Sequence, residues 1–428
     1  MTAPRLVHLS DLERLYDDPE AVGRLAGTIQ ELRDGRTLVV GSGDTTALGA
    51  LSLSTDAGRE QARPFYEAVS PDADTLGNHD LDLGPEWAMQ WMRSTPGTHL
   101  LANASGFPGD DPAGSTILQV GKMRVGLIGV THPETPAICT AAETLTFEDP
   151  VDVVSRETAR LRERGADVVV VLSHCGTVDA DIAAETTVDA VLGGHVHDHV
   201  TAVVDGTLLA RTRGGQAGEY QVLTLGETLR VDHHLIDGAP LDEELAASYR
   251  DRHAAAGLDE AICQFPGPLT HAEAGRLVAD AYRQAADAAI GIVLGPSVRT
   301  GLSAQVTVGD VLGLVPFESD LLALEVAGRD IEAIASALPT PIEDSPARVF
   351  AAGLSREADG TTTVDGRPID PRATYRVATT GYLPYTELLP GITQDATATV
   401  VGPQHEIIVE AVRSGVVPAG SGRISRYP

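Results

Sequence analysis

The chain has 428 residues, 43% of them hydrophobic, which is enough for two or three domains with large buried cores. It carries 61 acidic against 31 basic residues, a formal net charge of -30, and Lys122 is its only lysine. Nucleic acids and anionic membranes are bound by clustered Lys and Arg, so this charge argues against both kinds of partner. An acidic excess of this size is typical of halophilic proteins from a high-salt cytoplasm, and nothing in it indicates the oligomeric state.

The first residues of the chain and its cysteines predict the cellular compartment in which the protein lies. Residues 1–5 lead directly into an apolar run, without the charged and apolar regions of a signal peptide. No apolar stretch approaches the roughly 18 residues of a membrane span. The three cysteines, Cys139, Cys175 and Cys263, lack C-x-x-C spacing and cannot all pair. We therefore expect a cytoplasmic protein without a disulfide framework.

Six apolar segments end abruptly in residues that bind metals or transfer protons. Such runs, separated by helical stretches, are typical of strands in a sheet covered on both faces, and these sheets bind ligands at the carboxyl ends of their strands. Five of the six segments are expected to converge on one site. The segments are 6–11, 38–44, 76–82, 101–103, 168–174 and 191–197.

The polar residues at these ends follow the order D, GD, GNHD, H and GGHVH. Imidazole combined with carboxylate favours manganese, iron or zinc over calcium. Taken singly, each residue also fits a purely structural role, as a solvated carboxylate, a hydrogen-bonded histidine or part of a turn. Their ordered recurrence at strand ends favours a metal site.

This pattern resembles that of the calcineurin-like metallophosphatases, and the longer stretches resemble the 5'-nucleotidase family within that superfamily. The resemblance implies a four-layer α/β/β/α sandwich that holds two divalent ions (Mn, Zn, Fe or Mg, with Mn favoured). Asp44 would be the carboxylate shared by both ions, and His79 and Asp82 would be the catalytic pair. The remaining ligands would be Asn78, His174 and His195 for one ion, and Asp11 and His197 for the other.

One position departs from the family pattern, because Glu13 stands where the family usually has histidine. A further carboxylate beside Asp11 and Asp44 adds negative charge and a harder ligand. The ion there should lose Lewis acidity and shift in preference toward manganese or magnesium. Glu13 would bind this ion directly or through water.

Two adjacent ions of this kind can hold a hydroxide at neutral pH and neutralise the oxygens of a phosphoryl group. In-line attack by this metal-bridging hydroxide requires no covalent protein intermediate. A protonated His79 would stabilise the transition state or protonate the leaving group, and Asp82 would orient its ring. The chain contains neither a G-x-S-x-G elbow nor a P-loop.

The second half is expected to form a smaller α/β substrate-binding domain. We expect a metallophosphatase domain over residues 1–240, a linker helix within 241–265 and the second domain over 266–428. Within the second domain, residues 272–289 should form a helix, and 290–294 and 321–326 should form strands. Segments 306–317, 321–334, 375–380 and 422–424 resemble the C-terminal domain of 5'-nucleotidases.

The resemblance implies three substrate-binding residues in this domain. Arg299 would bind the phosphate, since a guanidinium contacts two oxygens at once, although the preceding stretch lacks the family's glycine-rich sequence. Phe317 and Tyr382 would stack on either side of the nucleobase. The segments that normally recognise base and ribose differ here, which predicts a broad or shifted nucleotide preference.

The sequence thus predicts a metal-dependent 5'-nucleotidase that releases phosphate from nucleoside monophosphates, a small-molecule substrate. Two alternatives stay open. One is a phosphoesterase acting on a cyclic nucleotide, a nucleotide sugar or a small organic phosphate. The other is a non-catalytic nucleotide-binding protein on the same scaffold.

Overall fold

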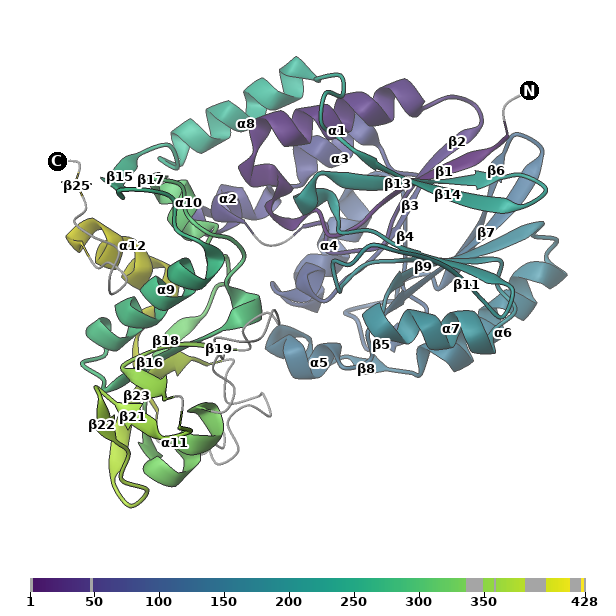
Figure 1. Ribbon diagram of the computed structural model, residues 1–428. Helices are drawn as coiled ribbons and strands as arrows, with labels where there is room; N and C mark the ends of the chain where they lie inside the picture. Colours follow the sequence, from purple (N-terminus) through teal and green to yellow (C-terminus); the bar gives the residue numbers. More distant parts are fainter. Residues whose placement is uncertain are drawn as a thin grey trace. The chain divides into compact units, whose positions relative to one another are not determined.

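The computed structural model describes residues 3–46, 49–335, 349–357, 359–381, 398–415 and 425–426. Contacts between residues divide the chain into two compact units (Figure 1). Unit 1 comprises residues 1–47 and 57–252, and unit 2 comprises residues 48–56 and 253–428. None of the helices in the described parts of the chain is both long and apolar enough to cross a membrane.

Unit 1 is built on two mixed six-stranded sheets. Four of the six predicted strand segments overlap strands of these sheets, whereas segments 76–82 and 101–103 begin directly after the strands that end at Thr75 and Leu100. The first sheet has the order β14 (Leu229–Leu235), β13 (Glu219–Leu225), β1 (Arg5–Leu9), β2 (Thr37–Gly41), β3 (Ala73–Thr75), β4 (Thr98–Leu100). The second has the order β11 (Val200–Val204), β12 (Thr207–Arg211), β10 (Ala190–Gly193), β9 (Val168–His174), β7 (Met123–Thr131), β6 (Ser115–Val120). In each sheet four neighbouring strands run parallel, β1 to β4 and β7, β9, β10 and β12.

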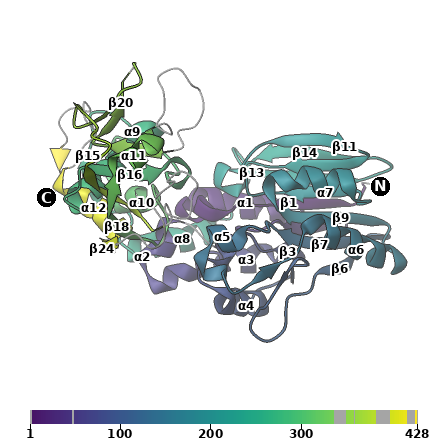
Figure 2. The same ribbon diagram turned by 90° about the horizontal axis from the view of Figure 1, so that it is seen from below.

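The two sheets pack face to face and helices cover their outer faces. Leu6 and Val40 of the first sheet share one buried cluster with Leu127 and Leu172 of the second. This core buries the inner face of each sheet. Figures 1 and 2 show the helices outside the sheets. They are α1 (Pro19–Leu32), α3 (Arg63–Val69), α4 (Pro85–Ser94), α5 (Thr135–Ile138), α6 (Pro150–Glu163) and α7 (Asp179–Glu185). The predicted four-layer sandwich is confirmed.

Unit 2 is a smaller α/β unit around a five-stranded sheet, as predicted. The sheet has the order β19 (Val349–Ala352), β16 (Ile290–Leu294), β23 (Thr374–Thr380), β18 (Asp320–Ala327), β24 (Ala398–Pro403). The helices of this unit are α2 (Ala50–Ser54), α9 (His271–Ala285), α10 (Val308–Leu312), α11 (Gly328–Ala335) and α12 (Gln404–Ser414). The described residues of this unit also form two three-stranded sheets. One is made by β15 (Ala261–Gln264), β17 (Gln305–Thr307) and β25 (Ser425–Arg426), and the other by β20 (Leu354–Arg356), β21 (Thr362–Val364) and β22 (Arg367–Pro368).

Two predicted helices end earlier than expected, for a local reason. The linker helix expected within residues 241–265 is α8 (Glu243–Ala255), and Gly257 beyond it has a left-handed φ of 69°. The helix expected to reach residue 289 is α9, which ends at Ala285, and Asp287 beyond it has a φ of 47°. A left-handed residue ends an α-helix because it turns the chain away from the helix axis.

Candidate metal centre

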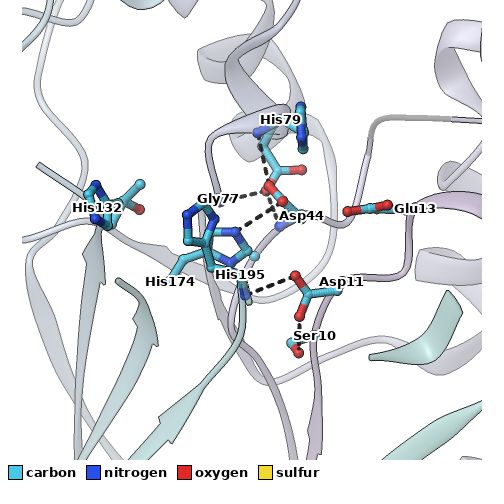
Figure 3. A network of polar contacts seen from close by, with 12 residues as sticks. Ser10, Asp11, Glu13, Asp44, Gly77, His79, His132, His174 and His195 are labelled. Atoms are coloured by element: carbon cyan, nitrogen blue, oxygen red, sulfur yellow. Dashed lines mark hydrogen bonds and ion pairs between the residues drawn. The ribbon is translucent and has the colours of Figure 1, made fainter. Parts of the chain in front are cut away.

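Parallel strands bring the predicted ligands to one edge of the sandwich. Asp11 and Asp44 lie two and three residues beyond β1 and β2, and Asn78 lies three residues beyond β3. In the second sheet, His174 is the last residue of β9 and His195 lies two residues beyond β10. Because the carboxyl ends of parallel strands meet at the same edge, the side chains of Asp11, Asp44, His174 and His195 converge (Figure 3).

Three of the predicted ligands form what we call the Asp44 group: Asp44, His174 and His195. Their ligand atoms all lie within 4.8 Å of one another, and Nε2 of His174 is 3.0 Å from Oδ2 of Asp44. Nδ1 of His174 is 2.6 Å from the carbonyl oxygen of Ser42, so this bond fixes the ring with Nε2 toward Asp44. A histidine ligand is commonly oriented by such a bond from its other nitrogen.

Asn78 fits a place beside this group. It is 4% exposed, and its side-chain oxygen has no hydrogen-bond partner among the described residues. The next residue, His79, donates its backbone N–H to Oδ1 of Asp44 (2.9 Å). A buried carbonyl oxygen without a partner is unfavourable unless a cation satisfies it.

Three further predicted ligands form the Asp11 group: Asp11, Glu13 and His197. Nε2 of His197 lies 3.2 Å from Oδ1 of Asp11 and 3.3 Å from Oε1 of Glu13. Both carboxylates are fully buried. The side-chain amide of Gln216 hydrogen bonds to Nδ1 of His197 (2.8 Å), so Nε2 is the nitrogen that faces the carboxylates.

Glu13 lies within reach of both groups. Its carboxylate also has an oxygen within 4.8 Å of ligand atoms of Asp44 and His79. Figure 3 shows this carboxylate directed toward the space shared with Asp44. Carboxylate and imidazole donors in two adjacent groups are a suitable set for two first-row divalent ions. The residues present therefore fit the metals that the sequence implies.

The backbone is strained at most of these positions. A positive φ is uncommon outside glycine and is tolerated where the surrounding structure enforces it, often at functional sites. Of the nine described non-glycine residues with positive φ, five are predicted ligands. They are Asp11 (49°), Glu13 (33°), Asp44 (52°), His195 (76°) and His197 (53°).

Asp80 holds the loop that presents Asp44, a role that the sequence analysis missed. Its buried carboxylate accepts backbone N–H groups from Gly77 (2.8 Å), Asp44 (2.8 Å), Thr45 (2.9 Å) and Thr46 (2.8 Å). The signal was available, because Asp80 belongs to the GNHD segment. A carboxylate that accepts several N–H groups is a common way to fix a loop.

His79 and Asp82 form the expected pair. Nδ1 of His79 lies 2.9 Å from Oδ2 of Asp82. Burial disfavours the charged ring, but Asp82 and Asp44 outweigh it and raise the pKa of His79 to about 9. Burial likewise opposes ionisation of Asp44, yet His174 and His79 hold the pKa of Asp44 well below its usual range. The pair can therefore supply a proton next to an ionised carboxylate.

His132 is a second residue that the sequence analysis missed. It directly follows β7, and its ring centroid lies 5.4 Å from that of His195 (Figure 3). Burial lowers the pKa of His132, which favours the neutral ring. The run 125–131 that precedes it has the same form as the other strand segments and could have revealed it.

In unit 2, two of the predicted substrate residues contact each other. The guanidinium carbon of Arg299 lies 5.2 Å from the ring centroid of Phe317, a cation–π contact. Both side chains are partly buried. The third, Tyr382, lies outside the described residues.

Comparison with models of protein families shows the family to which the chain is related. A family model for calcineurin-like phosphoesterases matches residues 4–199, and a model for the 5'-nucleotidase C-terminal domain matches residues 266–386. The chain belongs to the 5'-nucleotidase family. Apart from residues 48–56, the first match lies in unit 1, and the second lies in unit 2.

Individual relatives agree with this membership. A 5'-nucleotidase of Diplobatis ommata is 32% identical over 187 residues, covering 41% of this chain and 32% of the relative. An apyrase of Aedes aegypti is 32% identical over 151 residues, covering 31% of this chain and 25% of the relative. The matched part thus spans a third or less of these two curated relatives.

Solved structures show the shared fold. A 5'-nucleotidase precursor from Thermus thermophilus superposes with a TM-score of 0.78 at 19% identity and covers 96% of both chains. A sulfate thiohydrolase from the same organism gives a TM-score of 0.77 at 19% identity, covering 100% of this chain and 96% of the other. Both likenesses extend over the two units.

Proposed function

We propose that the chain hydrolyses nucleoside monophosphates and releases inorganic phosphate. The observation that carries this proposal is the His79–Asp82 pair beside two adjacent groups of metal ligands. A protein that only bound a nucleotide would not need a histidine held by a carboxylate, 2.9 Å away, beside the metal ligands. A perturbed titratable group next to charged ligands is typical of a catalytic site.

Each group of side chains has a distinct task in this proposal. The Asp44 group, with Asn78, and the Asp11 group would each hold one divalent ion. When bound, the two ions would neutralise charge on the phosphoryl oxygens and activate water for in-line attack. His79 would donate a proton to the leaving oxygen, and Asp82 would keep its ring in position.

Glu13 influences the choice of metal. Two buried carboxylates and one imidazole make the Asp11 group richer in hard oxygen donors than the Asp44 group. Oxygen ligands favour manganese or magnesium over softer ions. We therefore propose manganese as the ion that best supports activity.

Unit 2 would recognise the nucleoside and phosphate. Arg299 is suited to phosphate because its planar fork contacts two oxygens. Its guanidinium carbon also lies 5.2 Å from the ring centroid of Phe317, the aromatic residue that would stack on the nucleobase. Stacking on an aromatic ring contributes about 1–3 kcal/mol per base and accepts any base.

The test compares kcat/KM of the Mn²⁺-loaded protein for nucleoside monophosphates, cyclic nucleotides, nucleotide sugars and p-nitrophenyl phosphate. We expect the nucleoside monophosphates to be preferred. Phe317→Ala should reduce this preference about 10- to 100-fold while leaving p-nitrophenyl phosphate hydrolysis unchanged. Arg299→Ala should impair phosphate esters more than Arg299→Lys, which keeps the charge but not the fork.

The same set of substrates distinguishes the proposed function from the two alternatives, which are hydrolysis of another phosphoester and nucleotide binding without catalysis. Faster turnover of another phosphoester would replace the nucleotide assignment while keeping the metal chemistry. No turnover of any of these esters by a protein that holds two metal ions would leave nucleotide binding without catalysis, and the proposal would be wrong.

A further inference from the structure

A third group of side chains that could hold a metal ion lies in unit 1, and it shares no residue with the proposed metal centre. It consists of His199, Glu219 and His233, whose ligand atoms lie within 4.8 Å of one another. The three residues come from different segments: the loop before β11, the first position of β13, and β14. None was singled out from the sequence, because no short spacing connects them.

Strand pairing explains how the cluster forms. β13 and β14 are antiparallel, with Glu219 opposite Leu235 and Gln221 opposite His233. Glu219 and His233 therefore lie on the same face, one diagonal step apart, because side chains alternate between faces. Thr201 of β11 brings its hydroxyl within 2.8 Å of Nε2 of His233.

β11 and β14 are the edge strands of the two sheets. The contact from Thr201 to His233 joins them, and His199 immediately precedes β11. The cluster thus lies where the two layers of the sandwich meet along one open edge.

The donor atoms converge on one point. Nδ1 of His199 lies 2.9 Å and Nδ1 of His233 lies 3.0 Å from the same oxygen, Oε1 of Glu219. The two rings are stacked, with centroids 3.7 Å apart. In a tetrahedral zinc site with bonds of about 2.0–2.1 Å, neighbouring donors are about 3.3 Å apart. Movements of a few tenths of an ångström would therefore admit an ion.

Hydrogen bonds from neighbouring residues orient these side chains in the way that metal ligands are usually oriented. Arg213 donates from Nε to the other oxygen of Glu219 (2.7 Å), which is itself 2% exposed. Thr201 fixes the far nitrogen of His233, so that its Nδ1 faces the carboxylate. Hydrogen bonds of this kind from outer residues orient metal ligands. Burial also lowers the pKa of His233, which favours the neutral ring that a metal requires.

A simple ion-pair network explains less of this geometry. Arg213 already neutralises the charge of Glu219. A carboxylate offers about four lone-pair sites on two oxygens, so two imidazoles that acted only as hydrogen-bond donors could be spread over both. Here both nitrogens approach one oxygen, as they would around a shared cation.

We propose that one further first-row divalent cation binds to His199, Glu219 and His233, and that Zn²⁺ fits these ligands best. The bound ion links the two sheets at their open edge. Two histidines and one glutamate form an established zinc ligand set, with water in the fourth position. The loop that carries His199 also carries His195 and His197, so the ion would restrain the segment that supplies one histidine to the Asp44 group and one to the Asp11 group.

The test measures bound metal rather than turnover, so its outcome is independent of the proposed function. Wild type, His199→Ala, His233→Ala and His234→Ala are stripped with chelator, loaded with Zn²⁺, passed through a desalting column and assayed for zinc per chain. His234 is the matched control, because it is the exposed neighbour of His233 on β14 and stacks on Tyr220 instead (centroids 5.1 Å apart).

We expect wild type and His234→Ala to retain one more zinc ion per chain than His199→Ala and His233→Ala. Zn²⁺ should also raise the melting temperature of the first two proteins more than that of the others. His199 is half exposed, so its variant remains informative even if His233→Ala fails to fold. Equal zinc content in wild type, His234→Ala and His199→Ala would overturn the proposal.

Discussion

Substitution of Gly77 by alanine should disable the metal centre through one added carbon atom. A Cβ at this position would lie 2.0 Å from Oδ1 and 2.6 Å from Cγ of Asp44. Carbon atoms approach one another favourably at about 3.5 Å, so the carboxylate would have to move by about 0.9 Å. Gly77 has no left-handed φ, so the effect is steric and not one of backbone strain.

The size of this displacement gives the expected loss of kcat/KM. Metal–ligand distances tolerate changes of about 0.2 Å, several times less than this shift. Loss of an outer contact to a ligand already lowers metal affinity or activity about 10- to 100-fold. Moving the proposed shared ligand itself should lower kcat/KM at least about 100-fold, or about 2.7 kcal/mol.

The assay measures kcat/KM, metal content and far-UV circular dichroism of Gly77→Ala and of a matched control. Gly35→Ala is that control, because a Cβ there meets no atom within 4 Å and its φ is not left-handed. It should behave as wild type. A folded Gly77→Ala protein with full metal content and more than a third of wild-type kcat/KM would refute the reasoning.

Three other substitutions test separate parts of the site. His79→Ala should lower turnover about 10²- to 10⁴-fold with metal content unchanged, and wild-type turnover would contradict its assigned role as a proton donor. Glu13→His should retain or increase activity while changing the order of activation by Mn²⁺, Mg²⁺ and Zn²⁺; an unchanged order would separate Glu13 from the metals. Asp80→Ala removes a carboxylate that accepts four backbone N–H groups and should lower the free energy of unfolding by about 3 kcal/mol or more. Urea denaturation checks this value, and a loss below about 1 kcal/mol would mean that the loop is held by other contacts.

The strands and the order of their polar ends were predictable because each leaves a local signal. Residues 38–41 and 190–193, for example, are apolar runs that stop at a segment with predicted metal ligands, and both lie in strands. Segments 38–44 and 168–174 both end in residues of the kind that bind metals, and this predicted that Asp44 and His174 lie close together, although 130 positions separate them in the chain. Their roles as ligands stay proposals.

Other features had no local signal. His199, Glu219 and His233 meet only through strand pairing and the stacking of two sheets, which single-residue patterns do not reveal. The helix ends at Ala255 and Ala285 depend on residues with left-handed φ, one of them an aspartate, and aspartate adopts this conformation only in some contexts.

The short helix α2 has a practical consequence. It lies in the sequence between Asp44 and Asn78, yet it packs on α10 in unit 2, and its residues Ala50 and Leu51 are buried. The polypeptide therefore leaves the metallophosphatase fold and returns to it between two segments that carry predicted metal ligands. A fragment truncated at residue 240 would expose these apolar side chains to water. Poor expression or weak metal uptake by such a fragment would then report a missing packing partner and not a defective metal centre.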